Sequence, residues 1–203
     1  MTEIAQSPND SSLRRVVRIV ALLNLGYFGI EFAVAVTIGS VSLFADSIDF
    51  LEDASINFLI MFALAWSMKK RARVGMLLAG ILLVPGLATI WEAWEKFNHP
   101  LAPSPLALSL AGAGALAINL SCAFRLARFR HNSGSLTMAA FLSARNDALA
   151  NVAIIAAGLL TAFVWKSAWP DLIVGLGIAT MNADAARKVW GTARDEHSKA
   201  LTN

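Results

Sequence analysis

Long apolar stretches, separated by short polar breaks, run along most of this 203-residue chain. About 20 consecutive apolar residues cross the hydrocarbon core of a bilayer as one helix. We therefore predict an all-α, polytopic membrane protein with six transmembrane helices that form one bundle. The predicted spans are Val16–Ile38, Ser42–Trp66, Arg73–Trp94, Pro105–Leu126, Ser135–Val164 and Asp171–Val189.

The breaks between these spans carry residues that turn or end a helix. Gly39-Ser40 predicts a tight turn, Asn98–Pro105 holds three prolines, and Trp165–Pro170 ends in another proline. The chain begins and ends with polar segments, and we expect 1–13 to be a disordered cytoplasmic tail and 191–203 a short cytoplasmic tail. Residues 14–190 are then one transmembrane domain.

Basic residues gather in alternate breaks and predict the orientation. Lys and Arg are frequent before the first span, between the second and third, between the fourth and fifth, and after the sixth. The opposite breaks hold only Lys96 and Lys166. Because cytoplasmic loops carry the excess of Lys and Arg, we predict that both termini are cytoplasmic.

Composition agrees with a membrane location and argues against other classes. The chain is 57% hydrophobic and 15% charged, whereas soluble domains carry about 25% charged residues. The net charge of +3 does not indicate nucleic-acid binding, because the basic residues lie in short loops between apolar spans. The single Cys122 excludes an internal disulfide framework.

The second predicted span carries four acidic residues, which is unusual for a membrane helix. A charged side chain at the bilayer centre costs about 2.5–3.5 kcal/mol on insertion scales. These acids must therefore face the protein interior or a watery cavity, yet the only base deep in a span is Arg145. This imbalance indicates a pathway for cations. The four residues are Asp46, Asp49, Glu52 and Asp53.

Helical geometry brings a subset of these acids towards the fifth span. Asp49 and Asp53 share one face of the second span, together with Asp46. Ser143 and Asp147 share a face of the fifth span, and a tilt of that span would bring them to the same depth. If the two spans are neighbours, four oxygen-bearing side chains meet near the midplane and suit a divalent cation. We therefore predict a metal site formed by Asp49, Asp53, Ser143 and Asp147.

The same patterns allow structural interpretations. Arg145 could pair with Glu52 or Glu31. Asn24, Asn119 and Asn182 could form hydrogen bonds between helices. The small-residue run Ala111–Ala117 predicts close helix packing. Participation in the ion path stays open for four residues, which are Arg145, Asp46, Glu31 and Asn151.

The stretch from Gly39 to Asp49, preceded by Glu31 and completed by Asp53, resembles the cation diffusion facilitator family of six-helix divalent-metal exporters. The segments Ser143–Val152 and Trp91–Pro105 resemble the fifth helix and the third-helix exit of that family. The resemblance implies metal efflux by proton antiport with alternating access, in a homodimer in the bacterial cytoplasmic membrane. It implies no enzymatic activity and no resident cofactor.

Two features depart from the usual family pattern. Ser143 stands where the family most often has a histidine, so the ligand set contains only oxygen. Oxygen ligands weaken the preference for Zn²⁺ and leave Mn²⁺, Co²⁺ or Fe²⁺ open. The usual cytoplasmic ferredoxin-like domain is missing, so the resemblance is to a short form that lacks the C-terminal domain.

Two other function classes fit part of the pattern. An intramembrane phospholipid-head-group transferase would need an Asp-Gly…Ala-Arg…Gly…Asp-x-x-x-Asp arrangement, of which only the last element is present. A non-transporting membrane scaffold or subunit could instead pair the buried acids with a partner's bases. Metal transport by the purified protein alone would separate a transporter from a scaffold.

Overall fold

The computed structural model describes residues 8–63, 87, 89–129, 135–181, 183, 184 and 187. Within these residues all regular secondary structure is helical, in agreement with the predicted all-α class. The long helices are α1 (Pro8–Ile38), α2 (Val41–Ala63), α4 (Pro105–Ala127) and α5 (Ser135–Phe163). Shorter helical segments cover residues 89–98 and Trp169–Met181.

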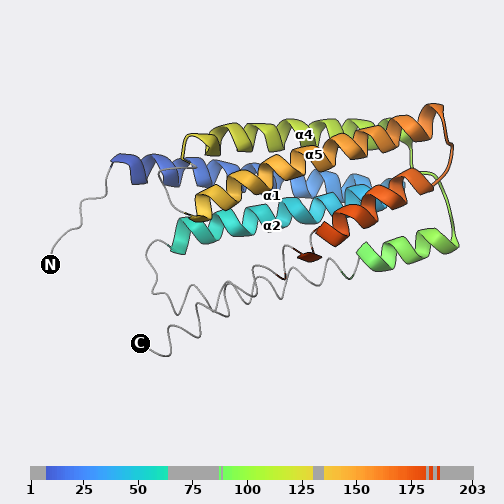
Figure 1. Cartoon of the computed structure of the whole chain (residues 1–203), viewed down its shortest axis with the longest axis horizontal. Coiled ribbons are helices and arrows are strands. Elements are labelled where there is room, and N and C mark those ends of the chain that lie inside the picture. Colours follow the sequence, from blue (N-terminus) through green and yellow to red (C-terminus); the bar gives the residue numbers. More distant parts are fainter. Residues whose placement is uncertain are drawn as a thin grey trace.

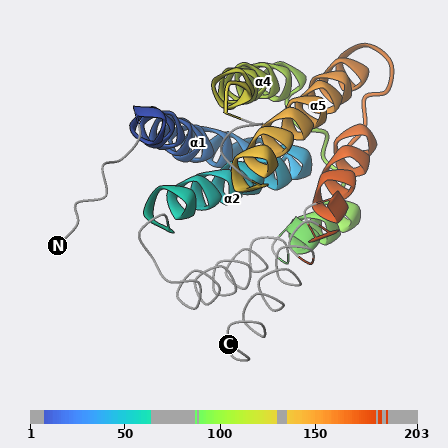
Figure 2. The same ribbon diagram turned by 60° about the vertical axis from the view of Figure 1, so that its left-hand side comes forward.

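The four long helices run side by side as a bundle (Figures 1 and 2). α1 packs along α2, α4 packs along α5, and α2 also contacts α5. The turns at residues 39–40, 99–104 and 164–168 lie at one end of the bundle, which we call the turn end. The start of α1 and the end of α4 lie at the other end, which we call the arginine end.

The start of α1 corrects one prediction. The helix begins at Pro8, so residues 8–13 form its first turns and do not belong to a disordered tail. Leu13 explains the difference, because it is buried in an apolar cluster with Val17 and Leu126. The third predicted span also continues past Trp94, since helix extends to residue 98. The predicted basic loop at 67–72 and the tail at 191–203 lie outside the described residues.

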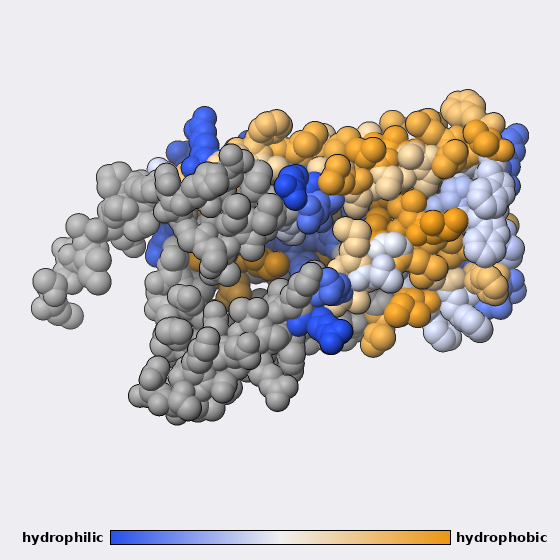
Figure 3. Space-filling model, in the orientation of Figure 1, coloured by the Kyte–Doolittle hydropathy of each residue, from blue (hydrophilic) through white to orange (hydrophobic). Residues whose placement is uncertain are grey.

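The outward faces of the bundle are suited to lipid. Within the described part of the chain, three helices are long and apolar enough to cross a membrane: Ser12–Ile38, Pro105–Ala127 and Ser143–Phe163. Large apolar side chains such as Leu22 and Leu149 are exposed on their surfaces. The space-filling view shows apolar residues over the middle of the bundle and more polar residues towards the turn end (Figure 3). These features are those of an integral membrane protein.

Of the three apolar clusters among the described residues, two lie between the long helices, one towards each end of the bundle. The cluster at the arginine end includes Val17, Ile60 and Leu126. The cluster at the turn end includes Leu43 and Ile154. Buried polar residues of α1, α2 and α5 lie along these helices between the two clusters: Asn24, Glu31, Asp49, Asp53 and Asn151. The polar layer is therefore enclosed by apolar packing on both sides.

Small residues allow the helices to approach closely, as the run at 111–117 predicted. A Cβ on Gly112 would lie 3.1 Å from Cγ2 of Ile154 on α5. Helix Trp169–Met181 approaches α2 in the same way, because a Cβ on Gly175 would lie 2.7 Å from the carbonyl carbon of Val41. Glycine, which has no side chain, thus allows the helices to approach closely at both contacts.

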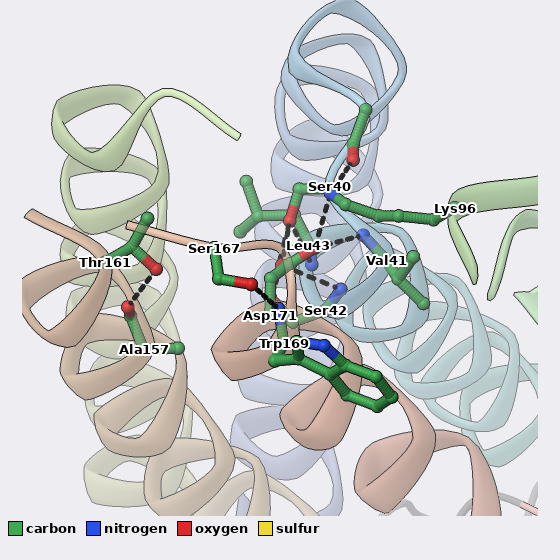
Figure 4. A network of polar contacts seen from close by, with 11 residues as sticks. Ser40, Val41, Ser42, Leu43, Lys96, Ala157, Thr161, Ser167, Trp169 and Asp171 are labelled. Atoms are coloured by element: carbon green, nitrogen blue, oxygen red, sulfur yellow. Dashed lines mark hydrogen bonds and ion pairs between the residues drawn. The ribbon is translucent and has the colours of Figure 1, made fainter. Parts of the chain in front are cut away.

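A buried ion pair fixes the start of α2 at the turn end (Figure 4). Nζ of Lys96 lies 2.9 Å from Oδ2 of Asp171 and also donates to the carbonyl of Gly39. The Asp171 carboxylate accepts the backbone N–H of Val41 at 2.9 Å and the hydroxyl of Ser42 at 2.6 Å. Three segments distant in sequence are therefore joined at the first turn of α2.

Candidate functional site

The acidic residues of α2 are withdrawn from the surface. Asp46 is fully buried, Asp53 is 3% exposed and Asp49 is 8% exposed. Glu52 is partly buried. Placing these carboxylates inside the bundle avoids the cost of exposing charge to hydrocarbon, as the sequence predicted.

Asp53 joins α2 to two other helices. The hydroxyl of Ser143 on α5 donates to Oδ1 of Asp53 at 2.9 Å. Nδ2 of Asn24 on α1 lies 3.5 Å from Oδ2 of the same carboxylate. α2 and α5 are therefore in contact here, which is the condition on which the sequence-based hypothesis of a shared site depended.

A cavity of about 110 Å³ lies beside this contact. Its lining includes all four residues that the sequence brought together as candidate ligands, together with three others from α2, α5 and the last described helix. The lining residues are Asp49, Glu52, Asp53, Ser143, Asn146, Asp147 and Met181. Carboxylate, amide and hydroxyl oxygens dominate this set, and none of the described residues that line the cavity is basic.

The carboxylates share the cavity without already surrounding one point. Among the described residues, no three His, Cys, Asp or Glu side chains are grouped closely enough to hold a metal ion as they stand. Asp53 is instead held by Ser143 and Asn24. The arrangement is a cavity lined with potential ligands, and a bound ion would have to draw them together.

Arg145, the base that lies deep in a predicted span, does not neutralise the buried acids. Arg145 is exposed, and its guanidinium donates to Oδ1 of Asn146 at 3.3 Å. The structural pairing with Glu52 or Glu31 that we considered is not formed. The acids at the cavity therefore remain available to a cation.

Glu31 and Asp46 form a separate buried pair between α1 and α2. Both are fully buried, and no donor group of the described residues reaches any of their four carboxyl oxygens. The two side chains are neighbours inside the bundle. Neither residue lines the cavity. The buried Asn151 likewise turns away, since its amide donates to the backbone carbonyl of Asp147.

Sequence reasoning missed several neighbours of the candidate site. Asn24 was predicted to form an interhelical hydrogen bond, and this is confirmed, but its partner Asp53 was not anticipated. The thiol of Cys122 on α4 lies 3.7 Å from Oδ1 of Asn24, so it faces the amide from a fourth helix. Polar groups inside apolar helices were the only available signal for these contacts. Asn182, grouped with Asn24 in that prediction, lies outside the described residues.

A comparison with known protein families covers the whole of this region. The model of the cation efflux transmembrane domain matches residues 17–193, which includes every residue of the cavity lining. The match spans most of the chain and agrees with the resemblance seen at Gly39–Asp53. Proteins with this domain transport metal cations. The chain therefore belongs to the cation efflux family.

Proposed function

We propose that this protein carries a divalent metal cation out of the cytoplasm in exchange for protons, by alternating access. The observation that supports the proposal most strongly is the cavity between α2 and α5. Asp49, Asp53 and Asp147 line it together, and no basic side chain of the described part of the chain does. A buried group of carboxylates without a base needs either a metal ion or protons to offset its charge.

The candidate ligands are already close to a binding arrangement. Ser143 contacts Asp53 directly, so one hydroxyl and one carboxylate from different helices meet at 2.9 Å. A metal ion that enters the cavity would be coordinated by the oxygens of this pair and would draw Asp49 and Asp147 towards it. The site would then consist of three carboxylates and one hydroxyl.

The all-oxygen ligand set bears on the choice of metal. Carboxylate and hydroxyl oxygens are hard ligands, whereas Zn²⁺ sites commonly contain histidine nitrogen or cysteine sulfur. No histidine or cysteine lines the described cavity. Mn²⁺, Co²⁺ and Fe²⁺ are therefore the preferred candidates, with Zn²⁺ as a weaker one.

Protons are the natural counterpart to the metal at this site. Carboxylates must lose their protons to bind a metal ion, so metal binding and proton binding exclude each other. Metal arriving from the cytoplasm would displace protons, and protons arriving from the other side would help to release the metal. The carboxylates themselves would perform both tasks, because no imidazole is present in the described cavity.

Alternating access requires that one end of the path closes while the other opens. At the turn end, the Lys96–Asp171 pair ties α2 to two neighbouring segments (Figure 4). With the predicted orientation, this end faces away from the cytoplasm. In the proposed cycle this contact would close the outer side, and export would require these segments to separate.

The proposal is tested by reconstituting the purified protein in proteoliposomes and measuring uptake of Mn²⁺, Co²⁺, Fe²⁺ and Zn²⁺ together with internal pH. We expect metal-dependent proton flux in the wild type. Asp53→Asn and Asp147→Asn should each lower it by more than about 100-fold, since even residues that only support metal ligands contribute about 10–100-fold.

Glu95→Gln is the matched control, because Glu95 is an exposed acid that does not line the cavity. It should leave the flux unchanged. Full flux in either aspartate variant would reject the proposed site. Absence of metal flux in the wild type would favour a non-transporting scaffold.

A further inference from the structure

A second, larger cavity lies at the arginine end of the bundle, away from the candidate metal site. Its volume is about 550 Å³, and it is formed by the first turns of α1 and by the last turns of α4 with the residues that follow. The lining residues are Ser12, Arg15, Val16, Ser121, Phe124, Arg125, Arg128 and Phe129. None of them belongs to the cavity between α2 and α5.

The polar part of this cavity is strongly basic. Arg15 comes from α1, whereas Arg125 and Arg128 come from the end of α4, and all three are exposed. No acidic residue is among the described residues that line the cavity, so these residues do not balance the guanidinium charges. Three guanidinium groups on two helices provide a fork of donors suited to phosphate oxygens.

Beside two serines, the rest of the lining is apolar and consists of Val16, Phe124 and Phe129, which limits the kind of anion that fits. Phe124 is 75% exposed, although it lies on a helix long and apolar enough to cross a membrane. Val16 on α1 contributes further apolar surface to the cavity. A ligand that fills this space would place an anionic group among the arginines and hydrocarbon against Phe124. A free inorganic anion would contact the arginines but would leave the apolar surface at Phe124 uncovered.

We propose that this cavity binds the headgroup of an anionic phospholipid, with an acyl chain lying along Phe124. Basic pockets between transmembrane helices at the membrane surface are known to hold such headgroups. A zwitterionic headgroup is disfavoured, because its own cation would enter a cavity that already holds three arginines. The bound lipid would join the start of α1 to the end of α4.

The proposal does not depend on the transported ion. Further from the arginine end, a hydrogen bond joins α1 and α4 directly, since the hydroxyl of Tyr27 donates to the carbonyl of Ala111 at 2.6 Å. At the arginine end the cavity separates polar groups of the two helices. An anionic lipid would add a polar link beside the apolar cluster that already joins the two helices there, and would raise the resistance of the protein to heat.

Native mass spectrometry of the delipidated full chain tests this inference. The protein is titrated with phosphatidylglycerol, with phosphatidylcholine of the same acyl chains, and with inorganic phosphate. We expect retention of phosphatidylglycerol alone. Arg125→Gln combined with Arg128→Gln should weaken it by roughly 30-fold, because each arginine near an anionic lipid contributes a factor of about five.

The matched control is Lys166→Gln combined with Arg187→Gln, which removes the same charge at two exposed positions outside the cavity. It should bind phosphatidylglycerol like the wild type. Equal retention of phosphatidylcholine would overturn the proposal, as would equal weakening by the control. Displacement of the lipid by equimolar phosphate would show that the cavity recognises a free anion and would also overturn it. The comparison of headgroups on the wild type does not rely on the folding of any variant.

Discussion

At the scale of single residues, Asp53 is the side chain through which three helices meet. Ser143 approaches one of its oxygens from α5, and Asn24 approaches the other from α1. The sequence predicted that this acid would be buried, because charge in hydrocarbon is costly. It could not predict the two partners, since they lie 90 and 29 residues away and their approach depends on how the helices pack.

Replacing Asn24 tests whether the amide orients Asp53 for ion binding. Asn24→Ala should weaken metal binding about fivefold, corresponding to the loss of one hydrogen bond of ~1 kcal/mol. Isothermal titration of the purified protein with Mn²⁺ measures this change. Asn98→Ala is the control, because Asn98 is exposed and donates only to its own helix at Trp94. Equal affinity in wild type and Asn24→Ala would show that the amide does not support the site.

At the scale of secondary-structure elements, apolar stretches predicted most helix boundaries well. α4 and α5 end within one residue of their predicted limits, at Ala127 and Phe163. The first helix began earlier than predicted because Leu13 gains burial against α4. The role of Asp171 was also missed, since a single acid at a span boundary looks solvent-exposed until Lys96 and the start of α2 are placed around it.

The contact between α2 and helix Trp169–Met181 leads to a prediction about stability. Gly175→Ala would place a Cβ 2.7 Å from the backbone of Val41, which cannot yield as a flexible side chain would. We expect it to destabilise the protein by about 1–3 kcal/mol, the usual cost of overpacking. A lowered midpoint in a thermal unfolding scan would report this.

Gly177→Ala provides the comparison for this prediction, because no atom lies within 4 Å of the added Cβ. It should leave the midpoint unchanged or raise it slightly, since alanine favours the helix by about 1 kcal/mol over glycine. If both variants unfolded at the same temperature, the close approach at Gly175 would not contribute to stability.

At the scale of the whole molecule, the bundle encloses a polar layer between two apolar clusters. The ligand types of the candidate site followed from the sequence, because intramembrane acids without bases are rare and need a compensating charge. Their convergence did not follow, because it requires α2 and α5 to be neighbours. The structure provides that contact and the cavity beside it.

The central claim is that one cation is held jointly by α2 and α5. The most direct measurement is anomalous diffraction from crystals of the protein soaked in Mn²⁺. The account predicts a single strong peak in this cavity, within about 2.0–2.5 Å of carboxylate oxygens of both Asp53 and Asp147. A peak bound by only one of these helices, or no peak in the cavity at saturating Mn²⁺, would contradict it.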